Sequence, residues 1–426
     1  VVMLPERHRL EKGLYRVEGP ARVKVIEGSG FYALGQVFSV GRELVVPRGY
    51  TICIEVGEWC TIEVSGGRLS QAKPDEEVVD KWRMLAQSIA APGRVLVVGE
   101  VDSGKTTFST YLLNTAIAKG LSVAVIDADV GQNDIGWPGT IALALPEKPV
   151  SWLGELEPKA FYFIGTNTPA GCEDAVVVGL TKLLRKASRR DLVIVNTDGW
   201  VGDRRALAFK CRIVEVVEPT TLVVMEGTGA SEPIARIFEE TDIRVVRAPT
   251  PAAARGKERE LRKLRRELSY LSLLKESAVK AISLEKARLW ATYTFNGQRD
   301  EKLSLMLSTL LGFEVNAEVC GNVVVLTTLG EKEYKRLLEF KDQVSKLANR
   351  DVLVSHLGGL EGYLVGIANE RLEHVGIGVI EEVDPTNKII KVRTPFDREG
   401  AKILLLGKIR LSEDGVERER SMPPIA

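Results

Sequence analysis

The chain has 426 residues, with 58 Lys and Arg against 58 Asp and Glu, so its formal net charge is zero. A charged fraction of 27% beside 45% hydrophobic residues is typical of a globular protein with several domains. A net charge of zero excludes a protein that binds nucleic acid through an overall positive charge. Any anionic partner must therefore be held by a local cluster of positive charge.

Five cysteines are scattered without a CxxC pair, so the sequence predicts neither a disulfide framework nor a zinc ribbon. No stretch approaches the ~18 consecutive apolar residues that a membrane helix needs. We therefore expect a soluble, cytoplasmic protein that does not bind membranes. Only three histidines occur, and chemistry based on histidine is not expected.

Short β-rich segments punctuated by glycine fill the beginning of the chain. Hydrophobic residues alternate with polar ones, and turn signals separate the segments, at residues 21–26, 43–46, 50–56 and 60–64. This pattern predicts a small antiparallel sandwich or barrel, and we expect a β-rich N-terminal domain over residues 1–70. A helix is expected to follow from residue 75 to about 91, where Pro92 and Gly93 end it.

The pattern then changes to continuous apolar runs that are separated by segments of helix length. These runs lie at residues 95–98, 122–126, 191–195 and 221–225. Strands without alternation are typical of a parallel sheet with helices on both faces, so we expect an α/β domain of the P-loop NTPase type over residues 71–280. Strand patterns return beyond it, with a helix near residues 331–348, and predict a β-rich, α+β C-terminal domain over residues 281–426.

Residues 99–106 match the phosphate-binding pattern G-x-x-x-x-G-K-[ST] between an expected strand and an expected helix. The two glycines let the backbone curl so that successive amides face phosphate oxygens at a helix N-terminus. We expect Lys105 to bridge the β- and γ-phosphates and Thr106 to bind Mg²⁺. The alternative, a chance match, does not explain the strand and helix on either side. The expected ATP-binding residues are Gly99, Glu100, Val101, Asp102, Ser103, Gly104, Lys105, Thr106 and Thr107.

Two aspartates follow the next expected strand, at positions 127 and 129. Ligands bind at the carboxyl edge of an open α/β sheet, so one carboxylate is expected to face the nucleotide. Asp129 could then hold Mg²⁺ or accept a proton from an attacking hydroxyl. The alternative is a pair of aspartates that cap a turn.

A third signal is the segment Asn196-Thr-Asp-Gly-Trp200, directly after the expected strand at residues 191–195. An isolated tryptophan is more often part of a core. At the same edge as the phosphate loop, however, an indole beside a glycine offers a stacking surface for a base or sugar.

The fourth signal is a cluster of positive charge. Residues 244–266 contain nine basic residues against two acidic ones, and Pro249 and Pro251 precede the arginine-rich helix. A solvated helix face is the ordinary interpretation of such a run. Its position also suits a lid whose arginines close over the transferring phosphate.

Together these four features resemble the polynucleotide 5′-hydroxyl kinase family. That family includes the RNA kinase of eukaryotic pre-mRNA cleavage and tRNA splicing and the kinase of pre-rRNA processing. The resemblance covers roughly residues 93–270, and the family's three-part plan is similar to the segmentation above. The segments that carry it are Gly104-Lys-Thr-Thr107, Asp129-Val-Gly-Gln132, Pro138-Gly-Thr140, Tyr162-Phe-Ile-Gly-Thr-Asn-Thr-Pro169 and Thr197-Asp-Gly-Trp200.

The resemblance implies a role for each matching residue. Lys105 would stabilise the phosphates, Thr106 and Asp129 would hold Mg²⁺, and Asp129 would also activate the 5′-hydroxyl. Arg255 would be the leading lid arginine, with Arg259 as the nearest candidate for the second and Arg262 as the alternative. The substrate-binding residues would be Gln132, Thr168, Thr197, Gly199 and Trp200.

The residues alone predict a P-loop phosphotransferase or NTPase with a lid. The resemblance implies transfer of the γ-phosphoryl group of ATP to 5′-OH ends of RNA in RNA processing, with DNA ends and protein partners left open. One alternative is an ATP-binding scaffold subunit, against which the intact Lys105, Asp129 and Arg255 argue. A GTPase is not supported, because the guanine-reading pattern N-K-x-D does not occur in the chain. A partitioning-type ATPase is not supported either, because the lysine that this class carries early in the phosphate loop is missing. A small-molecule kinase remains an alternative.

Overall fold

The computed structural model describes residues 4–251, 259–397, 400–418 and 421–425. The chain forms two compact units. The first consists of Val1–Tyr162 and Thr168–Arg262, and the second of Phe163–Asn167 and Lys263–Ala426.

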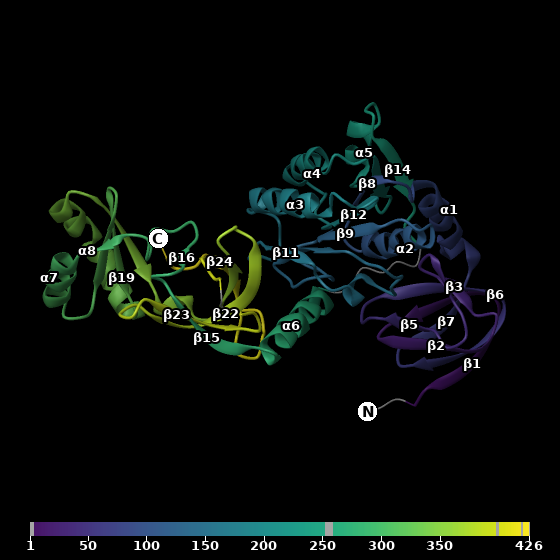
Figure 1. Ribbon diagram of the computed structural model, residues 1–426, viewed down its shortest axis with the longest axis horizontal. Coiled ribbons are helices and arrows are strands. Elements are labelled where there is room, and N and C mark those ends of the chain that lie inside the picture. Colours follow the sequence, from purple (N-terminus) through teal and green to yellow (C-terminus); the bar gives the residue numbers. More distant parts are fainter. Residues whose placement is uncertain (1–3, 252–258, 398–399, 419–420, 426) are drawn as a thin grey trace. The chain divides into compact units, whose positions relative to one another are not determined.

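An antiparallel sheet of seven strands begins the first unit (Figure 1). The strands follow the order β4-β3-β6-β1-β7, and β2 pairs with β5 and β6. Buried and exposed residues alternate along β2, as the sequence pattern predicts, because successive side chains point to opposite faces. The bounds are β1 Glu6–Glu18, β2 Ala21–Gly28, β3 Phe31–Ala33, β4 Gln36–Phe38, β5 Glu43–Val46, β6 Thr51–Ser65 and β7 Arg68–Ala72.

The α/β part of the first unit is built on the strand order β14-β13-β8-β12-β9-β10-β11. The strands from β14 to β9 are parallel, which confirms the predicted sheet, whereas β10 runs antiparallel to β9. The strand bounds are β8 Gly93–Val98, β9 Val123–Ala128, β10 Thr140–Ala144, β11 Ala160–Phe163, β12 Leu192–Thr197, β13 Thr221–Met225 and β14 Arg244–Ala248.

Helices cover both faces of this sheet, with α2 on one face and α3 and α4 on the other (Figure 1). The α-helices are α1 Val79–Ile89, α2 Lys105–Ala118, α3 Glu173–Ala187, α4 Arg204–Val217, α5 Glu232–Phe238 and α6 Arg259–Lys275, and short 3-10 helices lie at Pro74–Glu76 and Leu153–Glu155. The helix expected from residue 75 therefore begins as a separate 3-10 turn, and its α-helical part ends at Ile89.

Helix α2, which begins at the phosphate loop, is enclosed on several sides. The amide of Asn114 donates to the carbonyl oxygens of Leu34 and Val150 across 2.7 and 2.8 Å. The hydroxyl of Tyr111 lies 2.7 Å from that of Tyr32. Because Leu34 and Tyr32 belong to the N-terminal β part, that part forms one wall around the helix.

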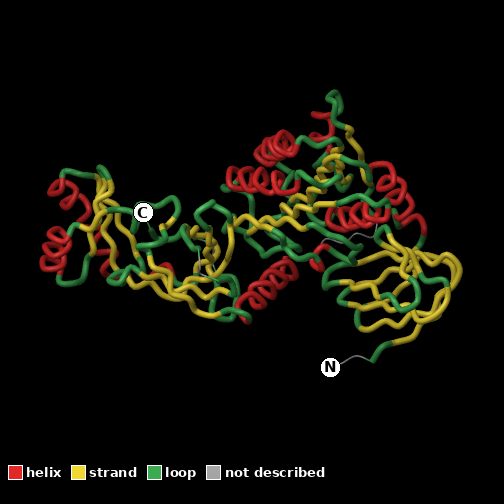
Figure 2. Tube along the Cα trace, viewed as in Figure 1, coloured by secondary structure: helices red, strands yellow, loops and turns green. Residues whose placement is uncertain are grey.

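The strands of the second unit fall into two groups (Figure 2). One includes β15 Ala278–Ser283, β16 Arg288–Leu289, β21 Tyr363–Ala368, β22 His374–Asp384, β23 Ile389–Thr394 and β24 Ile403–Arg410, with a 3-10 turn at Gly358–Leu360. The other has the order β17-β18-β19-β20 and packs with two helices. Its elements are β17 Gln298–Arg299, α7 Glu301–Leu311, β18 Asn316–Cys320, β19 Val323–Thr328, α8 Glu331–Ala348 and β20 Asp351–His356. Helix α8 has the predicted bounds, whereas α7 is an addition to the prediction.

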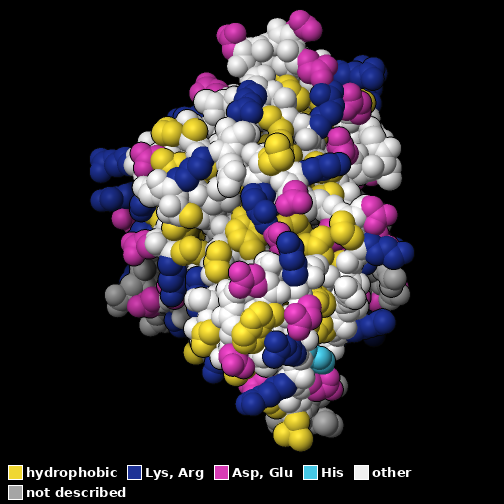
Figure 3. All heavy atoms as spheres, turned by 90° about the vertical axis from the view of Figure 1, so that its right-hand side faces the viewer, with side chains coloured by type: hydrophobic (Ala, Val, Ile, Leu, Met, Phe, Trp, Pro, Cys, Tyr) yellow, Lys and Arg dark blue, Asp and Glu magenta, His cyan; other side chains and the backbone are white. Residues whose placement is uncertain are grey.

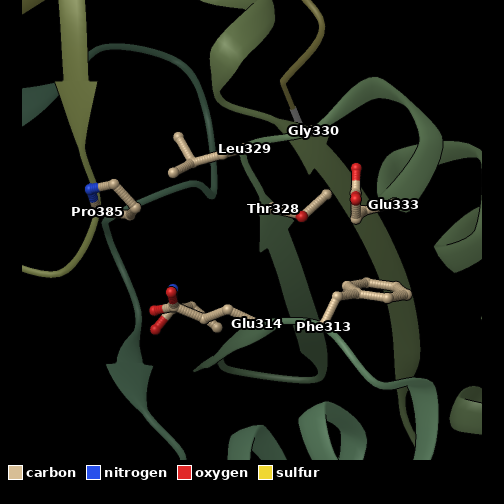
Figure 4. A pocket seen from close by; sticks show the side chains of 8 residues that line it. Phe313, Glu314, Thr328, Leu329, Gly330, Glu333 and Pro385 are labelled. Atoms are coloured by element: carbon tan, nitrogen blue, oxygen red, sulfur yellow. The ribbon is translucent and has the colours of Figure 1, made fainter.

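A pocket of about 210 Å³ lies in the second unit, and Figure 4 shows Phe313 and Pro385 on opposite sides of it. Glu314, Thr328 and Glu333 also line it. None of these residues belongs to the predicted catalytic or binding set.

Surface charge agrees with the neutral composition. On the face of the first unit that Figure 3 shows, basic and acidic side chains are interspersed rather than gathered into fields of one sign. Among the described residues, no helix combines the length and the apolar character that crossing a bilayer requires.

Candidate active site

The loop between β8 and α2 has the conformation that a phosphate-binding loop requires. Gly104, the residue before the first turn of α2, has a φ of 96°, which favours glycine. A β-carbon on Gly99 would lie 2.7 Å from the hydroxyl oxygen of Ser103 and 2.7 Å from the β-carbon of Met225. Gly99 is therefore required by the close packing of the loop, and Gly104 by its backbone conformation.

Lys105 begins α2 and is 7% exposed. Its Nζ donates to the carbonyl oxygen of Glu100 across 2.5 Å, so the ammonium folds back over the loop. Burial lowers the pKa of Lys105 to about 8, although the negative charge of Asp129 opposes this shift. A buried ammonium beside a phosphate-binding loop at a helix N-terminus suits phosphate oxygens.

The side chain of Glu100 is held by a neighbouring loop. Its carboxylate accepts hydrogen bonds from the amides of Thr228 and Ala230 at 2.9 and 3.0 Å. Burial alone would raise the pKa of Glu100, but these hydrogen bonds outweigh it and lower the pKa. Glu100 thus anchors the phosphate loop to the loop at residues 228–230.

Asp127, Asn196 and Thr106 form a chain of hydrogen bonds at the carboxyl edge of the sheet. The amide nitrogen of Asn196 donates to Asp127 Oδ1 across 3.0 Å and to Thr106 Oγ1 across 3.3 Å. Asp127 is fully buried and also accepts from the amide of Asp134 at 2.8 Å. Burial, with the charges of Asp134 and Asp129, raises the pKa of Asp127 to about 8.

Asp129 lies just beyond the end of β9, on the same edge. Its Oδ1 accepts from the amides of Gly131 and Gln132, each at 3.0 Å, which fixes the turn after the strand. Burial and the charge of Asp198 raise the pKa of Asp129, while Lys105 opposes them. Of the two aspartates, Asp127 is fully buried, whereas Asp129 is partly exposed and interacts electrostatically with Lys105.

The segment after β12 contacts the phosphate loop directly. A β-carbon on Gly199 would lie 2.6 Å from the amide nitrogen of Val101 and 2.7 Å from its Cα, so only glycine permits this approach. Thr197 is fully buried, and its hydroxyl donates to the carbonyl oxygen of Val97 across 2.8 Å. Trp200 is partly exposed, and its Nε1 donates to Asp203 Oδ2 across 2.6 Å.

The predicted lid residues have different positions. Arg255 lies outside the described residues, and Arg259 is the exposed first residue of α6. Arg262, one turn later, donates to Asp102 Oδ2 across 3.0 Å, and its carbonyl oxygen accepts from Gln132 Nε2 across 3.3 Å. Of these three arginines, Arg262 is the one that the described contacts bring to the phosphate loop.

The described contacts of Arg247 and Thr168 do not include the phosphate loop. Arg247, which lies in β14 within the basic cluster, pairs with Glu232 at 2.8 Å and Glu239 at 2.5 Å. The partly buried Thr168 accepts from the amide of Ala170 across 3.4 Å, a local turn contact.

Asn196, at this edge, and Lys210, in α4, were not predicted as site residues. Asn196 joins the phosphate loop to Asp127, and its place directly before Thr197 at the end of an apolar strand was the available signal. Lys210 pairs with Asp198 inside the protein, and no local pattern indicated it.

Comparison with known proteins gives relatives over most of the chain. Residues 99–276 match the family described as mRNA cleavage and polyadenylation factor CLP1 P-loop. A polyribonucleotide 5′-hydroxyl-kinase of Pyrococcus furiosus is 29% identical over 84% of this chain and 98% of its own length. One of Methanocaldococcus jannaschii is 28% identical over 76% of this chain and 89% of its own.

A Protein CLP1 homolog of Anopheles gambiae is 30% identical over 45% of this chain and 52% of its own length. Among solved structures, wild-type Clp1p in a complex with Pcf11p has a TM-score of 0.62 at 15% identity, covering 96% of this chain and 99% of its own. This likeness shows that the two chains share their fold.

Proposed function

We propose that this chain, whose residues 99–276 match the CLP1 P-loop family, is an ATP-dependent polynucleotide 5′-hydroxyl kinase. It transfers the γ-phosphoryl group of ATP to the 5′-OH end of RNA and acts in RNA processing in the cytoplasm. The names of the Pyrococcus and Methanocaldococcus relatives support this activity.

One observation carries the proposal. Lys105, Asp129 and the segment from Thr197 to Trp200 all lie at the carboxyl edge of one parallel sheet, where the phosphate loop meets Gly199. An NTPase that only hydrolyses ATP has no need for a partly exposed indole at this edge. A kinase with a nucleic-acid acceptor does, because a base or sugar can stack on it.

In the proposed reaction the amides of the loop and Lys105 hold the phosphates of ATP. The oxygen of the 5′-hydroxyl attacks the γ-phosphorus as the bond to the β–γ bridging oxygen breaks, and ADP leaves. Asp129 accepts the proton of the hydroxyl, and its raised pKa makes it a better base than an exposed aspartate. Gln132 and Trp200 position the acceptor, and Arg262 supplies positive charge near the loop.

The residues at this edge also fit Mg²⁺. Thr106, Asp127 and Asp129 supply hydroxyl and carboxylate oxygens, which are the ligands that Mg²⁺ prefers. The buried Oδ1 of Asn196 has no hydrogen-bond partner among the described residues, and a metal-bound water would satisfy it. Thr106 and Asp129 would hold the ion, which neutralises charge on the β- and γ-phosphates when bound.

The test is transfer of labelled γ-phosphate from ATP to matched 5′-OH strands of RNA and DNA, single and double. Strands that already carry a 5′-phosphate are the control and should gain no label. We expect Lys105→Ala and Asp129→Ala to abolish labelling, and Trp200→Ala mainly to raise the KM for the acceptor. Wild-type protein that binds ATP but labels no strand would instead favour the scaffold alternative, and labelled nucleosides would favour a small-molecule kinase.

A further inference from the structure

A buried ion pair lies beneath the segment that contacts the phosphate loop. Lys210, in the middle of α4, has a side chain that is 0% exposed, and the side chain of Asp198 is 6% exposed. The ammonium of Lys210 donates to Asp198 Oδ2 across 2.7 Å and to the carbonyl oxygen of Asp198 across 3.2 Å. Burying two charges is costly, so a pair of this kind indicates a role beyond general stability.

The same carboxylate also holds the residue that we propose stacks on the acceptor. Asp198 Oδ1 accepts from the amide of Trp200 across 2.9 Å. One carboxyl group therefore connects α4, through Lys210, to the backbone of Trp200. The indole in turn packs on Phe209, the neighbour of Lys210, with ring centroids 5.9 Å apart.

Gly199 lies between these two anchors, and its backbone packs against Val101 of the phosphate loop. A shift of Asp198 would therefore move Trp200 on one side and disturb the contact with the phosphate loop on the other. The ion pair is therefore linked through the backbone to both the indole of Trp200 and the phosphate loop.

The two charges of the pair also act on the reacting groups. The charge of Asp198 raises the pKa of Asp129, and it favours the protonated form of Lys105, whereas Lys210 disfavours that form. Because the two charges lie 2.7 Å apart, their effects on Lys105 oppose each other. Loss of Lys210 would leave the negative charge of Asp198 uncompensated beside Asp129.

We propose that Lys210 is a positioning residue for the acceptor strand: its ion pair with Asp198 fixes Trp200 at the distance from the phosphate loop that transfer requires. This role rests on the proposed kinase function. A residue that only stabilises the fold would lower the amount of active enzyme without changing the affinity for one substrate. A positioning residue changes the KM for the acceptor while the KM for ATP stays near its wild-type value.

The experiment compares Lys210→Met and Lys210→Arg with wild type, using a 5′-OH oligoribonucleotide and measuring the KM for each substrate, kcat and thermal unfolding. We expect Lys210→Met to raise the acceptor KM about tenfold and the ATP KM less than about twofold, and Lys210→Arg to restore much of the loss. The matched control is Lys388→Met, which removes a lysine from a buried carboxylate, Glu318, in the second unit. It should leave both KM values unchanged.

The double variant Asp198→Asn, Lys210→Met keeps the test decisive if Lys210→Met fails to fold. It removes both buried charges, so it should fold, yet it lacks the ion pair between Asp198 and α4 and should keep the raised acceptor KM. A wild-type acceptor KM in either variant would overturn the positioning role. Wild-type protein that labels no strand would instead refute the kinase function, so the two failures are distinguishable.

Discussion

Arg262 of α6 donates a hydrogen bond to the carboxylate of Asp102 in the phosphate loop, with 3.0 Å between Nη1 and Oδ2. Asp102 has a φ of 60°, a backbone conformation that is uncommon outside glycine. A guanidinium binds phosphate and carboxylate in the same geometry. The contact with Asp102 therefore places the guanidinium of Arg262 at the phosphate loop.

We expect Arg262→Ala to lower kcat about 100-fold, because the side chain near the loop supplies charge that the transition state needs. Arg259→Ala, at the exposed start of the same helix, should lower kcat less than Arg262→Ala does. Steady-state kinetics with a 5′-OH oligoribonucleotide provide the measurement. A larger loss in Arg259→Ala would make Arg259 the second lid arginine instead.

Gly199→Ala tests the contact between the acceptor segment and the phosphate loop. The added β-carbon would lie 2.6 Å from the amide nitrogen of Val101, so one backbone must move. A misplacement of about 1 Å in a catalytic site can lower kcat/KM about 100-fold. We expect Gly199→Ala to lower kcat/KM by about this factor. Gly202→Ala is the control, because a β-carbon there meets nothing within 4 Å. Equal activities of the two variants would contradict a functional contact at Gly199.

ATP binding without divalent cations should weaken as pH rises through 8. Burial lowers the pKa of Lys105 to about 8 in the nucleotide-free protein, and the protonated form is the one that binds phosphate. Between pH 7 and pH 9 the protonated fraction falls about tenfold, and calorimetry should show a similar rise in Kd. Lys105→Arg keeps its charge over this range, so its Kd should vary less with pH than the wild-type Kd does.

The stability of the metal-free protein should also depend on Asp127. The pKa of its carboxyl is raised to about 8 in the folded protein, so the folded state retains a proton that the unfolded state has already lost. This group therefore lowers the free energy of unfolding as pH rises from about 4 to 8. Asp127→Asn removes the titration, and urea unfolding at pH 5.5 and 7.5 should show a smaller fall with pH than in wild type. An unchanged slope would mean that Asp127 is ionised in the folded state.

Patterns among neighbouring residues were sufficient to predict the parts of the structure that neighbouring residues form. The phosphate loop follows an apolar strand and precedes a helix, and the helix α8 is amphipathic along its whole length. Helix α7 is absent from the sequence-based prediction although it has a local signal, since the side chain of Asp300 caps it by accepting from the amide of Leu303.

Contacts between distant residues could not be predicted in the same way. Asn196 reaches Thr106 and Asp127 across separations of 90 and 69 residues, which no local pattern encodes. Lys210 is a lysine in an amphipathic helix, where an exposed side chain is the normal expectation. Its burial depends on Asp198, whose position is set by the neighbouring strand and loop.

The enclosure of α2 has a consequence for how this protein can change over evolution. Asn114 and Tyr111 of α2 form hydrogen bonds with Leu34 and Tyr32 of the N-terminal β part. The helix that follows the phosphate loop is therefore buried partly by the N-terminal β part. A gene rearrangement that exchanged the first 70 residues for another module would expose this helix to water. The β part and the nucleotide-binding part are therefore expected to be inherited together, as a single evolutionary unit.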